Sequence, residues 1–259
     1  MTGGTLAADR DGDGQVVVLL HALAVDRRMW DPQWSPLRQR FDVVRLDLRG
    51  YGESGPPVRR THVEDLIEVL DHLEVPRAHL VGLSLGANVA MAAALAHPDR
   101  VGRLVLASPG LPGVPFPGVR PPDELMEVAR AEGSDAAKAH FIGHRVLEPT
   151  NRDPRTARTL SAMILESPVP QWGDGPHTPP LPPVADSLAD LTAPTLVVSG
   201  QLDIEGYRIT ADEVARRIPT AELLRVPGAG HLCSMDRPDV FTEAVSSFLA
   251  CARSSSQPG

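Results

Sequence analysis

Cysteine is scarce in this chain of 259 residues, which contains two, Cys233 and Cys251. They lie far apart and form no CxxC pair, so the sequence predicts neither a zinc site nor a disulfide framework. The pair His140 and His144 has a spacing that suits a metal, but the sequence offers no third ligand beside it. The DRDGDG stretch that begins at Asp9 lacks the glutamate that ends a calcium loop, so we interpret it as a turn. We therefore predict no metal.

Long apolar runs and an excess of positive charge are also missing. No apolar stretch approaches the roughly 18 residues that cross a bilayer, and the polar, acidic start MTGGTLAADRDGDG does not resemble a signal peptide. The net charge of −8 is opposite in sign to the basic surface of a nucleic-acid-binding protein. We expect a soluble, cytoplasmic protein with a small-molecule substrate and with no nucleic-acid or membrane partner. The sequence indicates no oligomeric state.

Most of the sequence alternates between short apolar runs and amphipathic segments. The apolar runs indicate buried strands at 15–22, 41–50, 78–84, 101–109, 194–203 and 221–230. Apolar residues at helical spacing indicate helices at 62–75, 85–98, 207–218 and 239–252. Strands that alternate with helices form a parallel sheet covered on both faces. We expect an α/β fold with a mostly parallel, doubly wound sheet.

Residues 110–190 interrupt this alternation. Helical patterns near 122–146 and 153–167 lie between two proline-rich stretches, PGLPGVPFPG and SPVPQWGDGPHTPPLPP. Such proline density does not suit the interior of a sheet. We therefore predict an α/β core formed by 1–109 and 191–259, into which 110–190 is inserted as a helical cap.

The stretch VGLSLGANVAM places Ser84 between Gly82 and Gly86, where a predicted strand ends and a predicted helix begins. A tight turn at this point forces the serine into an unusual backbone conformation, and larger flanking residues would collide with the strand and the helix. The turn exposes the hydroxyl beside the N–H of Leu85, which is free to bind an anion at the helix N-terminus. A purely structural turn is the alternative. The strand and helix around the motif favour a nucleophile.

A serine nucleophile needs a base, and the base needs a carboxylate to orient it. His231 follows the last predicted strand in the glycine-rich stretch PGAGHLC, and Asp203 follows the strand before it. The chain order Ser84, Asp203, His231 is the one that accompanies a Gly-x-Ser-x-Gly turn in this kind of fold. Glu205 is the nearest alternative for the carboxylate.

These segments together resemble the α/β-hydrolase superfamily. The resemblance covers nearly everything outside the inserted segment and the chain ends, in the stretches VVVLLHALAVDRRMW, VRLDLRGYGESGPP, GLSLGANVAMAAALAHPDRVGRLVLASP, APTLVVSGQLD and GAGHLCSMDRPDVFTEAVSSFL. It implies a cap inserted after the sixth strand in the family's numbering. It also implies that the N–H groups of Leu23 and Leu85 form an oxyanion hole. The family usually has glycine at the position of Ala22.

Within the superfamily, the chain resembles small bacterial carboxylesterases and enol-lactone hydrolases. A serine at the turn excludes the branches with an aspartate nucleophile, and Leu83 stands where carbon–carbon bond hydrolases often have asparagine. We expect a serine hydrolase that cleaves a carboxylic ester, lactone or thioester through an acyl-enzyme, without a cofactor. The alternatives are a lyase, cyclase or perhydrolase on the same scaffold, and a slow-turnover ligand-binding protein that keeps the three residues.

Large apolar side chains of the inserted segment are candidates for substrate contact, because ligand pockets are mostly apolar. The candidates are Phe116, Met126, Phe141, Met163 and Trp172. We single out Trp172 because it lies in the proline-rich return segment rather than on a predicted helix. The alternative is that Trp172 packs the cap onto the sheet.

Overall fold

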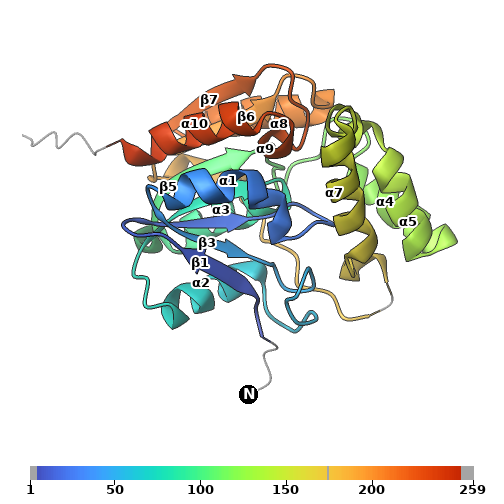
Figure 1. The fold of residues 1–259 in the computed structure, drawn as a ribbon, viewed down its shortest axis with the longest axis horizontal. Helices are drawn as coiled ribbons and strands as arrows, with labels where there is room; N and C mark the ends of the chain where they lie inside the picture. Colours follow the sequence, from blue (N-terminus) through green and yellow to red (C-terminus); the bar gives the residue numbers. More distant parts are fainter. Residues whose placement is uncertain (1–4, 174, 252–259) are drawn as a thin grey trace, which may run out of the picture.

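The computed structural model describes residues 5–173 and 175–251, which form a central sheet flanked by helices (Figure 1). Within these residues the sheet has seven strands in the order β1-β3-β2-β4-β5-β6-β7. The pair β1–β3 is antiparallel, and the other five pairs are parallel. The strands are β1 (Ala8–Asp11), β2 (Val16–Leu20), β3 (Asp42–Leu46), β4 (Ala78–Leu83), β5 (Val101–Ala107), β6 (Thr195–Gly200) and β7 (Ala221–Val226).

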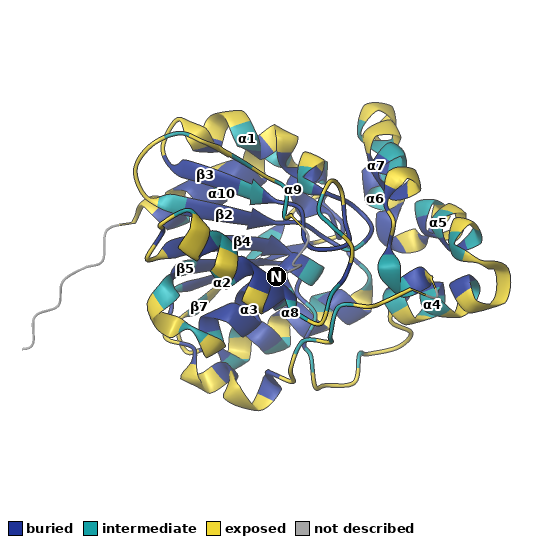
Figure 2. Cartoon of the chain, turned by 90° about the horizontal axis from the view of Figure 1, so that it is seen from below, coloured by how far each residue is buried: buried dark blue, intermediate teal, exposed yellow. Residues whose placement is uncertain are grey.

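Helices cover both faces of the sheet, and the five inner strands, β2 to β6, are almost wholly buried, whereas the edge strands β1 and β7 are largely exposed or half-buried (Figure 2). Side chains of β2 alternate between the apolar clusters on the two faces. Burial on both faces accounts for the unbroken apolar runs in the sequence. The expected doubly wound sheet is thereby confirmed. One face carries α1 (Asp31–Arg38) and α10 (Pro238–Ala250), and the other carries α2 (His62–His72), α3 (Leu85–Ala96) and α8 (Glu205–Arg217).

The strand β1, the helix α1 and shorter helices such as α9 (Cys233–Asp236) lie outside the set expected from the sequence. The edge strand β1 has the polar sequence ADRD, so the start of the DRDGDG stretch is a strand and not the turn we predicted. Backbone pairing with β3 and the ion pair of Arg10 with Asp42, at 2.7 Å, hold it in place. Helix α1 contains Pro32 and Pro36, which conceal it from a search for helical patterns.

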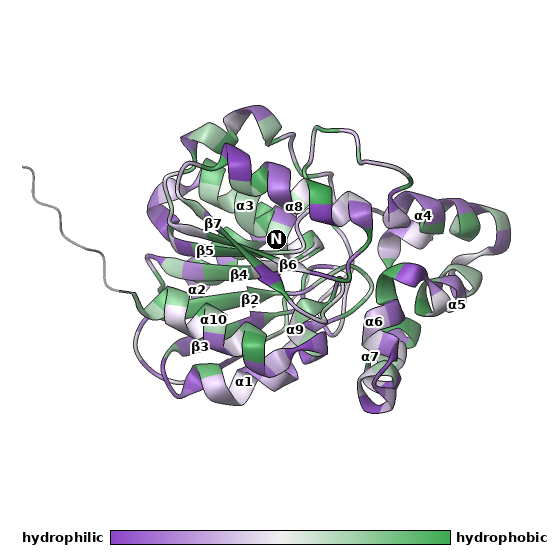
Figure 3. Cartoon of the chain, turned by 90° about the horizontal axis from the view of Figure 1, so that it is seen from above, coloured by the Kyte–Doolittle hydropathy of each residue, from purple (hydrophilic) through white to green (hydrophobic). Residues whose placement is uncertain are grey.

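The chain between β5 and β6 forms helices and turns at one end of the sheet (Figure 1), and no strand occurs in its described part. The predicted helix near 122–146 is two helices, because the chain breaks at Gly133, where φ is +92°. The helices carry both apolar and polar surface (Figure 3). The division into a core and a separate cap stays a prediction. The helices are α4 (Pro121–Glu132), α5 (Ser134–Gly143), α6 (Glu148–Asn151) and α7 (Pro154–Glu166).

Membrane-spanning length and hydropathy are not combined in any helix of the described residues.

The first turn of α3 approaches the end of β2 very closely. A Cβ on Gly86 would lie 2.1 Å from the carbonyl oxygen of Leu20 and 2.8 Å from that of His21. Both atoms belong to the backbone, so a side chain there cannot be relieved by a change of rotamer. The N–H of Gly86 donates to the carbonyl oxygen of His21 at 3.0 Å. Glycine is therefore required at this position for packing.

This contact predicts that Gly86→Ala lowers the free energy of unfolding by about 1–3 kcal/mol, the usual cost of overpacking. The control is Gly143→Ala, because a Cβ on Gly143 would meet no atom within 4 Å. Urea unfolding of the two variants measures the difference. Equal stability of Gly86→Ala and the unmodified protein would show that α3 can move away from β2 without cost.

Candidate active site

Ser84 lies in the turn between β4 and α3, with φ 53° and ψ −106°. This is a strained conformation for a residue with a side chain. A Cβ on Gly82 would lie 2.2 Å from the carbonyl oxygen of Gly86, so the turn needs glycine on both sides of the serine. The N–H of Ser84 donates to the carbonyl oxygen of Ala107 at 2.9 Å and anchors the turn to β5. The side chain, half-buried, faces the cavities described below.

His231 and Asp203 follow β7 and β6, and their side chains are joined. Nδ1 of His231 donates to Oδ2 of Asp203 at 2.9 Å, and the N–H of Ile204 donates to Oδ1 at 2.8 Å. The Asp203 side chain is fully buried and that of His231 is 7% exposed. Glu205 begins α8 and is exposed. The structure thus brings His231 to Asp203 rather than to Glu205, and the hydrogen bond keeps the proton of the neutral ring on Nδ1.

The loops that carry these two residues are held by the strands beside them. A Cβ on Gly200, at the end of β6, would lie 2.0 Å from the carbonyl oxygen of Gly230. The hydroxyl of Ser108, just after β5, donates to the carbonyl oxygen of His231 at 2.8 Å. His231 is therefore fixed through its backbone as well as through its ring.

Leu23 and Leu85, the predicted oxyanion donors, line the same cavity as Ser84. Leu85 is the first residue of α3, so its N–H has no acceptor within the helix. Leu23 lies in the turn after β2, and no group among the described residues accepts its N–H. The hydrogen bond from Gly86 to His21 keeps the two segments side by side. This arrangement can bind a negatively charged oxygen.

His21 fixes the backbone of the segment that contains Leu23. Its Nδ1 donates to the carbonyl oxygen of Ala22 at 2.7 Å, and its Nε2 accepts from the N–H of Leu48 at 2.9 Å. A carbonyl oxygen can only accept and an N–H can only donate, so a single neutral tautomer satisfies both bonds. Burial lowers the pKa of His21, which keeps the ring neutral. The role of His21 is therefore structural.

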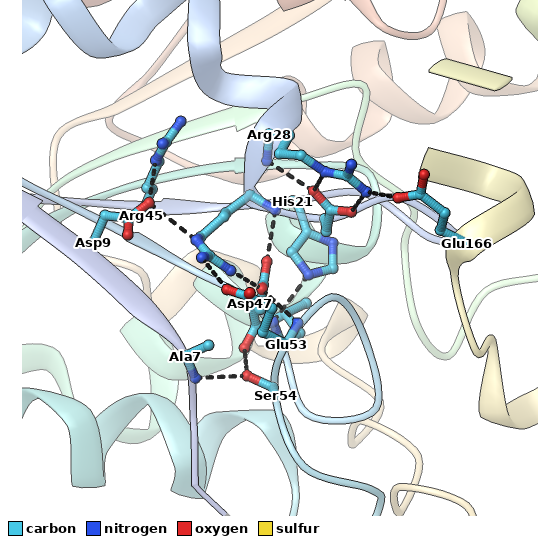
Figure 4. Close-up of polar contacts among 12 residues, drawn as sticks. Ala7, Asp9, His21, Arg28, Arg45, Asp47, Glu53, Ser54 and Glu166 are labelled. Carbon is cyan, nitrogen blue, oxygen red and sulfur yellow. Dashed lines mark hydrogen bonds and ion pairs between the residues drawn. The ribbon is translucent and has the colours of Figure 1, made fainter. Parts of the chain in front are cut away.

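A network of charged side chains surrounds this segment (Figure 4). Asp47, after β3, accepts the N–H of Arg27 at 2.7 Å and that of Glu53 at 2.9 Å. Arg28 reaches Glu166, the last residue of α7, at 2.7 Å. The segment after β2 is thus tied to β3 on one side and to the inserted helices on the other.

Two cavities meet at Ser84 in the described part of the chain. The larger has a volume of about 880 Å³, and its wall contains both apolar and charged side chains, such as Leu181 and Arg120. The smaller has a volume of about 20 Å³ and a mostly apolar wall. His231 lines the smaller cavity.

The five side chains predicted to contact substrate are divided by the structure. Phe116 lines the larger cavity and Phe141 the smaller. Trp172, Met126 and Met163 line neither, which corrects the prediction. Trp172 is 4% exposed and packs edge-on against Phe141, with ring centres 6.1 Å apart. Met163 belongs to the same apolar cluster as Trp172, and the half-buried Met126 packs against that cluster. Trp172 ends a short 3₁₀ helix (Pro170–Trp172), and its ring is buried against Phe141 of α5 instead of forming part of a cavity wall.

Tyr207 is a site residue that the sequence analysis missed. It lines both cavities, and its ring centre lies 4.1 Å from that of His231 and 4.9 Å from that of Phe116. Burial raises the pKa of Tyr207, and the charge of Asp203 raises it further. The available signal was its position, one helical turn after Asp203, at the start of a predicted helix.

The other candidate ligands lie away from Ser84. His140 and His144 both face Glu124 of α4, with Nε2–carboxylate distances of 2.9 Å and 3.5 Å. No group of three ligand side chains suited to a metal occurs within residues 5–173 and 175–251. Cys233 is fully buried, and this burial raises the pKa of its thiol and keeps it protonated.

A mostly parallel sheet, a serine in a strained strand–helix turn and a His–Asp pair after the last two strands together define an α/β-hydrolase. Residues 17–244 match the model of the alpha/beta hydrolase family, and the chain belongs to that family. It is an enzyme of the α/β-hydrolase type, similar in structure to esterases and lactonases.

Three similar proteins cover nearly the whole chain. A thermophilic esterase from Thermogutta terrifontis is 31% identical, with a TM-score of 0.81 over 95% of this chain and 93% of that one. An enol-lactonase from Burkholderia xenovorans LB400 is 27% identical, also with a TM-score of 0.81, over 95% of this chain and 97% of that one. A Bacillus subtilis protein, provisionally named 2-succinyl-6-hydroxy-2,4-cyclohexadiene-1-carboxylate synthase, is 26% identical over 91% of this chain and 90% of its own.

The packing of Trp172 predicts that Trp172→Ala lowers the free energy of unfolding by about 3–5 kcal/mol, as for other buried aromatic side chains. The relative rates on esters of different acyl length should not change. The comparison variant is Phe116→Ala, which removes a half-buried side chain from the larger cavity and should alter the acyl profile at little cost in stability. An altered profile for Trp172→Ala at near-normal stability would contradict this assignment.

The hydrogen bond between His231 and Asp203 predicts that Asp203→Asn lowers kcat on an ester by up to about 10⁴-fold, because the amide favours the wrong tautomer of the base. Glu205→Gln should leave kcat within about twofold, since Glu205 is exposed and does not contact the ring. Steady-state kinetics of the two variants make the comparison. A larger loss of kcat for Glu205→Gln than for Asp203→Asn would show that Glu205, and not Asp203, is the orienting carboxylate.

Proposed function

We propose that this enzyme is a serine hydrolase that cleaves a carboxylic ester, lactone or thioester through an acyl-enzyme on Ser84. One observation carries the proposal: Ser84 stands in a strained, accessible turn and lines a cavity together with His231, whose Nδ1 donates to the buried Asp203 at 2.9 Å. Similarity to an esterase and an enol-lactonase supports the same chemistry.

In the proposed first half-reaction, Ser84 Oγ attacks the carbonyl carbon and its proton passes to Nε2 of His231. Nε2 is the free base because Nδ1 holds the ring proton against Asp203. Asp203 stabilises the imidazolium, and the N–H groups of Leu23 and Leu85 bind the oxyanion. His231 then gives the proton to the leaving group, and water releases the acid by the same steps in reverse order.

The similarity to a protein named as a synthase favours one alternative, a non-hydrolytic enzyme on the same scaffold. A lyase or cyclase would use Ser84 and His231 for proton transfer and would release no acid from simple esters. A slow-turnover binding protein would react with a serine probe but would hydrolyse no ester. Both alternatives are thus distinguished by turnover on simple esters.

A fluorophosphonate probe should label Ser84 alone, as mapped by mass spectrometry of peptides. Ser84→Ala should abolish labelling and lower kcat on esters by about 10⁶-fold, the loss typical of a removed nucleophile. The control is Ser187→Ala, because Ser187 is exposed and lies outside both cavities. Labelling at another serine, or normal turnover by Ser84→Ala, would refute the proposed nucleophile.

A further inference from the structure

The two cavities at Ser84 differ greatly in size, and a carbonyl at Ser84 would have one substituent in each. Leu23, Ser84 and Tyr207 belong to both walls, so the reacting bond lies where the cavities meet. An ester has two substituents, the acyl chain and the alcohol. The question is therefore which cavity receives which part. The answer rests on the proposed function, because it uses the role of His231.

His231 decides the orientation. It must protonate the leaving alkoxide, so the alcohol part has to lie on the side of the imidazole. His231 lines the smaller cavity and is not part of the wall of the larger one. Tyr207 lines both cavities and lies against the imidazole, with ring centres 4.1 Å apart. The alcohol therefore enters the smaller cavity.

The volume of the smaller cavity limits the alcohol. It is about 20 Å³, which is roughly one fortieth of the volume of about 880 Å³ on the other side of Ser84. The smaller cavity therefore limits the alcohol part to a short chain such as a methyl or ethyl group. Apart from the shared site residues and His231, the wall is apolar, and its buried members include Val25, Leu125, Phe141, Val146, Leu147 and Leu160.

The larger cavity receives the acyl part. Its volume of about 880 Å³ is in the range of drug-sized ligand sites. The walls include apolar side chains such as Leu111 and Phe116, with polar groups such as Gln171 at other points. An acyl chain of ten or more heavy atoms, with an apolar body, fits this space.

We propose that the substrate is an open-chain ester of a bulky carboxylic acid with methanol or ethanol. Ser84 Oγ forms a bond to the carbonyl carbon, the bond from that carbon to the alkoxy oxygen breaks, and the serine proton leaves with the alcohol through His231. Water then adds to the acyl carbon, the bond to Oγ breaks, and Ser84 regains its proton. A thioester of a bulky thiol does not fit this division of the substrate between the two cavities. A lactone does not fit it either, because its ring joins the alcohol to the acyl chain.

An isomeric pair of esters tests the orientation on the intact enzyme. Methyl 4-phenylbutanoate places the bulk in the acid, and 3-phenylpropyl acetate places the same atoms in the alcohol. We expect kcat/KM to be about 10–100-fold higher for the methyl ester, a ratio that a cavity of limited size can produce. Labelling of Ser84 with the reverse preference, or with equal rates, overturns this inference and leaves the proposed function standing. Absence of both labelling and hydrolysis overturns the two together.

A second experiment enlarges the smaller cavity. Leu160→Ala should raise the butyl-to-methyl ratio of kcat/KM for esters of 4-phenylbutanoic acid by about tenfold or more. Val146→Ala, a smaller truncation in the same wall, should act in the same direction if Leu160→Ala does not fold. The matched control is Leu165→Ala, because Leu165 is on the same helix but 57% exposed. A folded variant with an enlarged cavity and an unchanged ratio contradicts the inference.

Discussion

The close approach of α3 to β2 is the contact on which the site depends. Gly86 has no room for a Cβ beside the carbonyl oxygen of Leu20, at 2.1 Å, and its N–H donates to His21 at 3.0 Å. Ser84 and Leu85 immediately precede Gly86, and Leu23 lies two residues after His21. A single backbone contact therefore sets the distance between Ser84, the proposed nucleophile, and the two proposed oxyanion donors. Because these donors are backbone groups on two packed elements, they need no reorganisation when charge develops, which is the condition for strong electrostatic stabilisation.

His231 is brought to the Ser84 edge of the sheet by a different set of contacts. β5 and β6 stand between β4, which leads to Ser84, and β7, which leads to His231. Ser108, at the end of β5, connects these strands: its N–H donates to Val198 of β6 at 2.8 Å, and its hydroxyl donates to the carbonyl oxygen of His231 at 2.8 Å. The adjacent Ala107 accepts from Ser84. The end of β5 thus holds the turn of Ser84 on one side and the loop of His231 on the other. Together with the strand order, these contacts bring residues 84 and 231 to the same edge of the sheet.

The sheet and the serine turn could be predicted because their signals are local. Buried strands produce continuous apolar runs, and the Gly-x-Ser-x-Gly pattern lies within five consecutive residues between a strand and a helix, although the close contact of Gly86 is with Leu20 and His21 of a distant segment. Elements held by tertiary contacts left no such signal: β1 is polar and depends on β3, and α1 contains two prolines. The break at Gly133 lies within one amphipathic pattern. The cavity walls were least predictable. Trp172 and Tyr207 are both buried aromatic residues, and only the way the inserted helices meet α8 and the core decides which of them reaches Ser84.

A covalent acyl group on Ser84 is the central claim of this account, and rapid-quench mass spectrometry measures it directly. The enzyme is mixed with methyl 4-phenylbutanoate and quenched in acid within milliseconds, and the mass of the intact protein is measured. The account predicts a mass increase equal to the phenylbutanoyl group, located on the peptide that contains residue 84. This acyl group forms as methanol is released and decays as the free acid appears. Release of the acid without any covalent species, or an acyl group on a different residue, would contradict it.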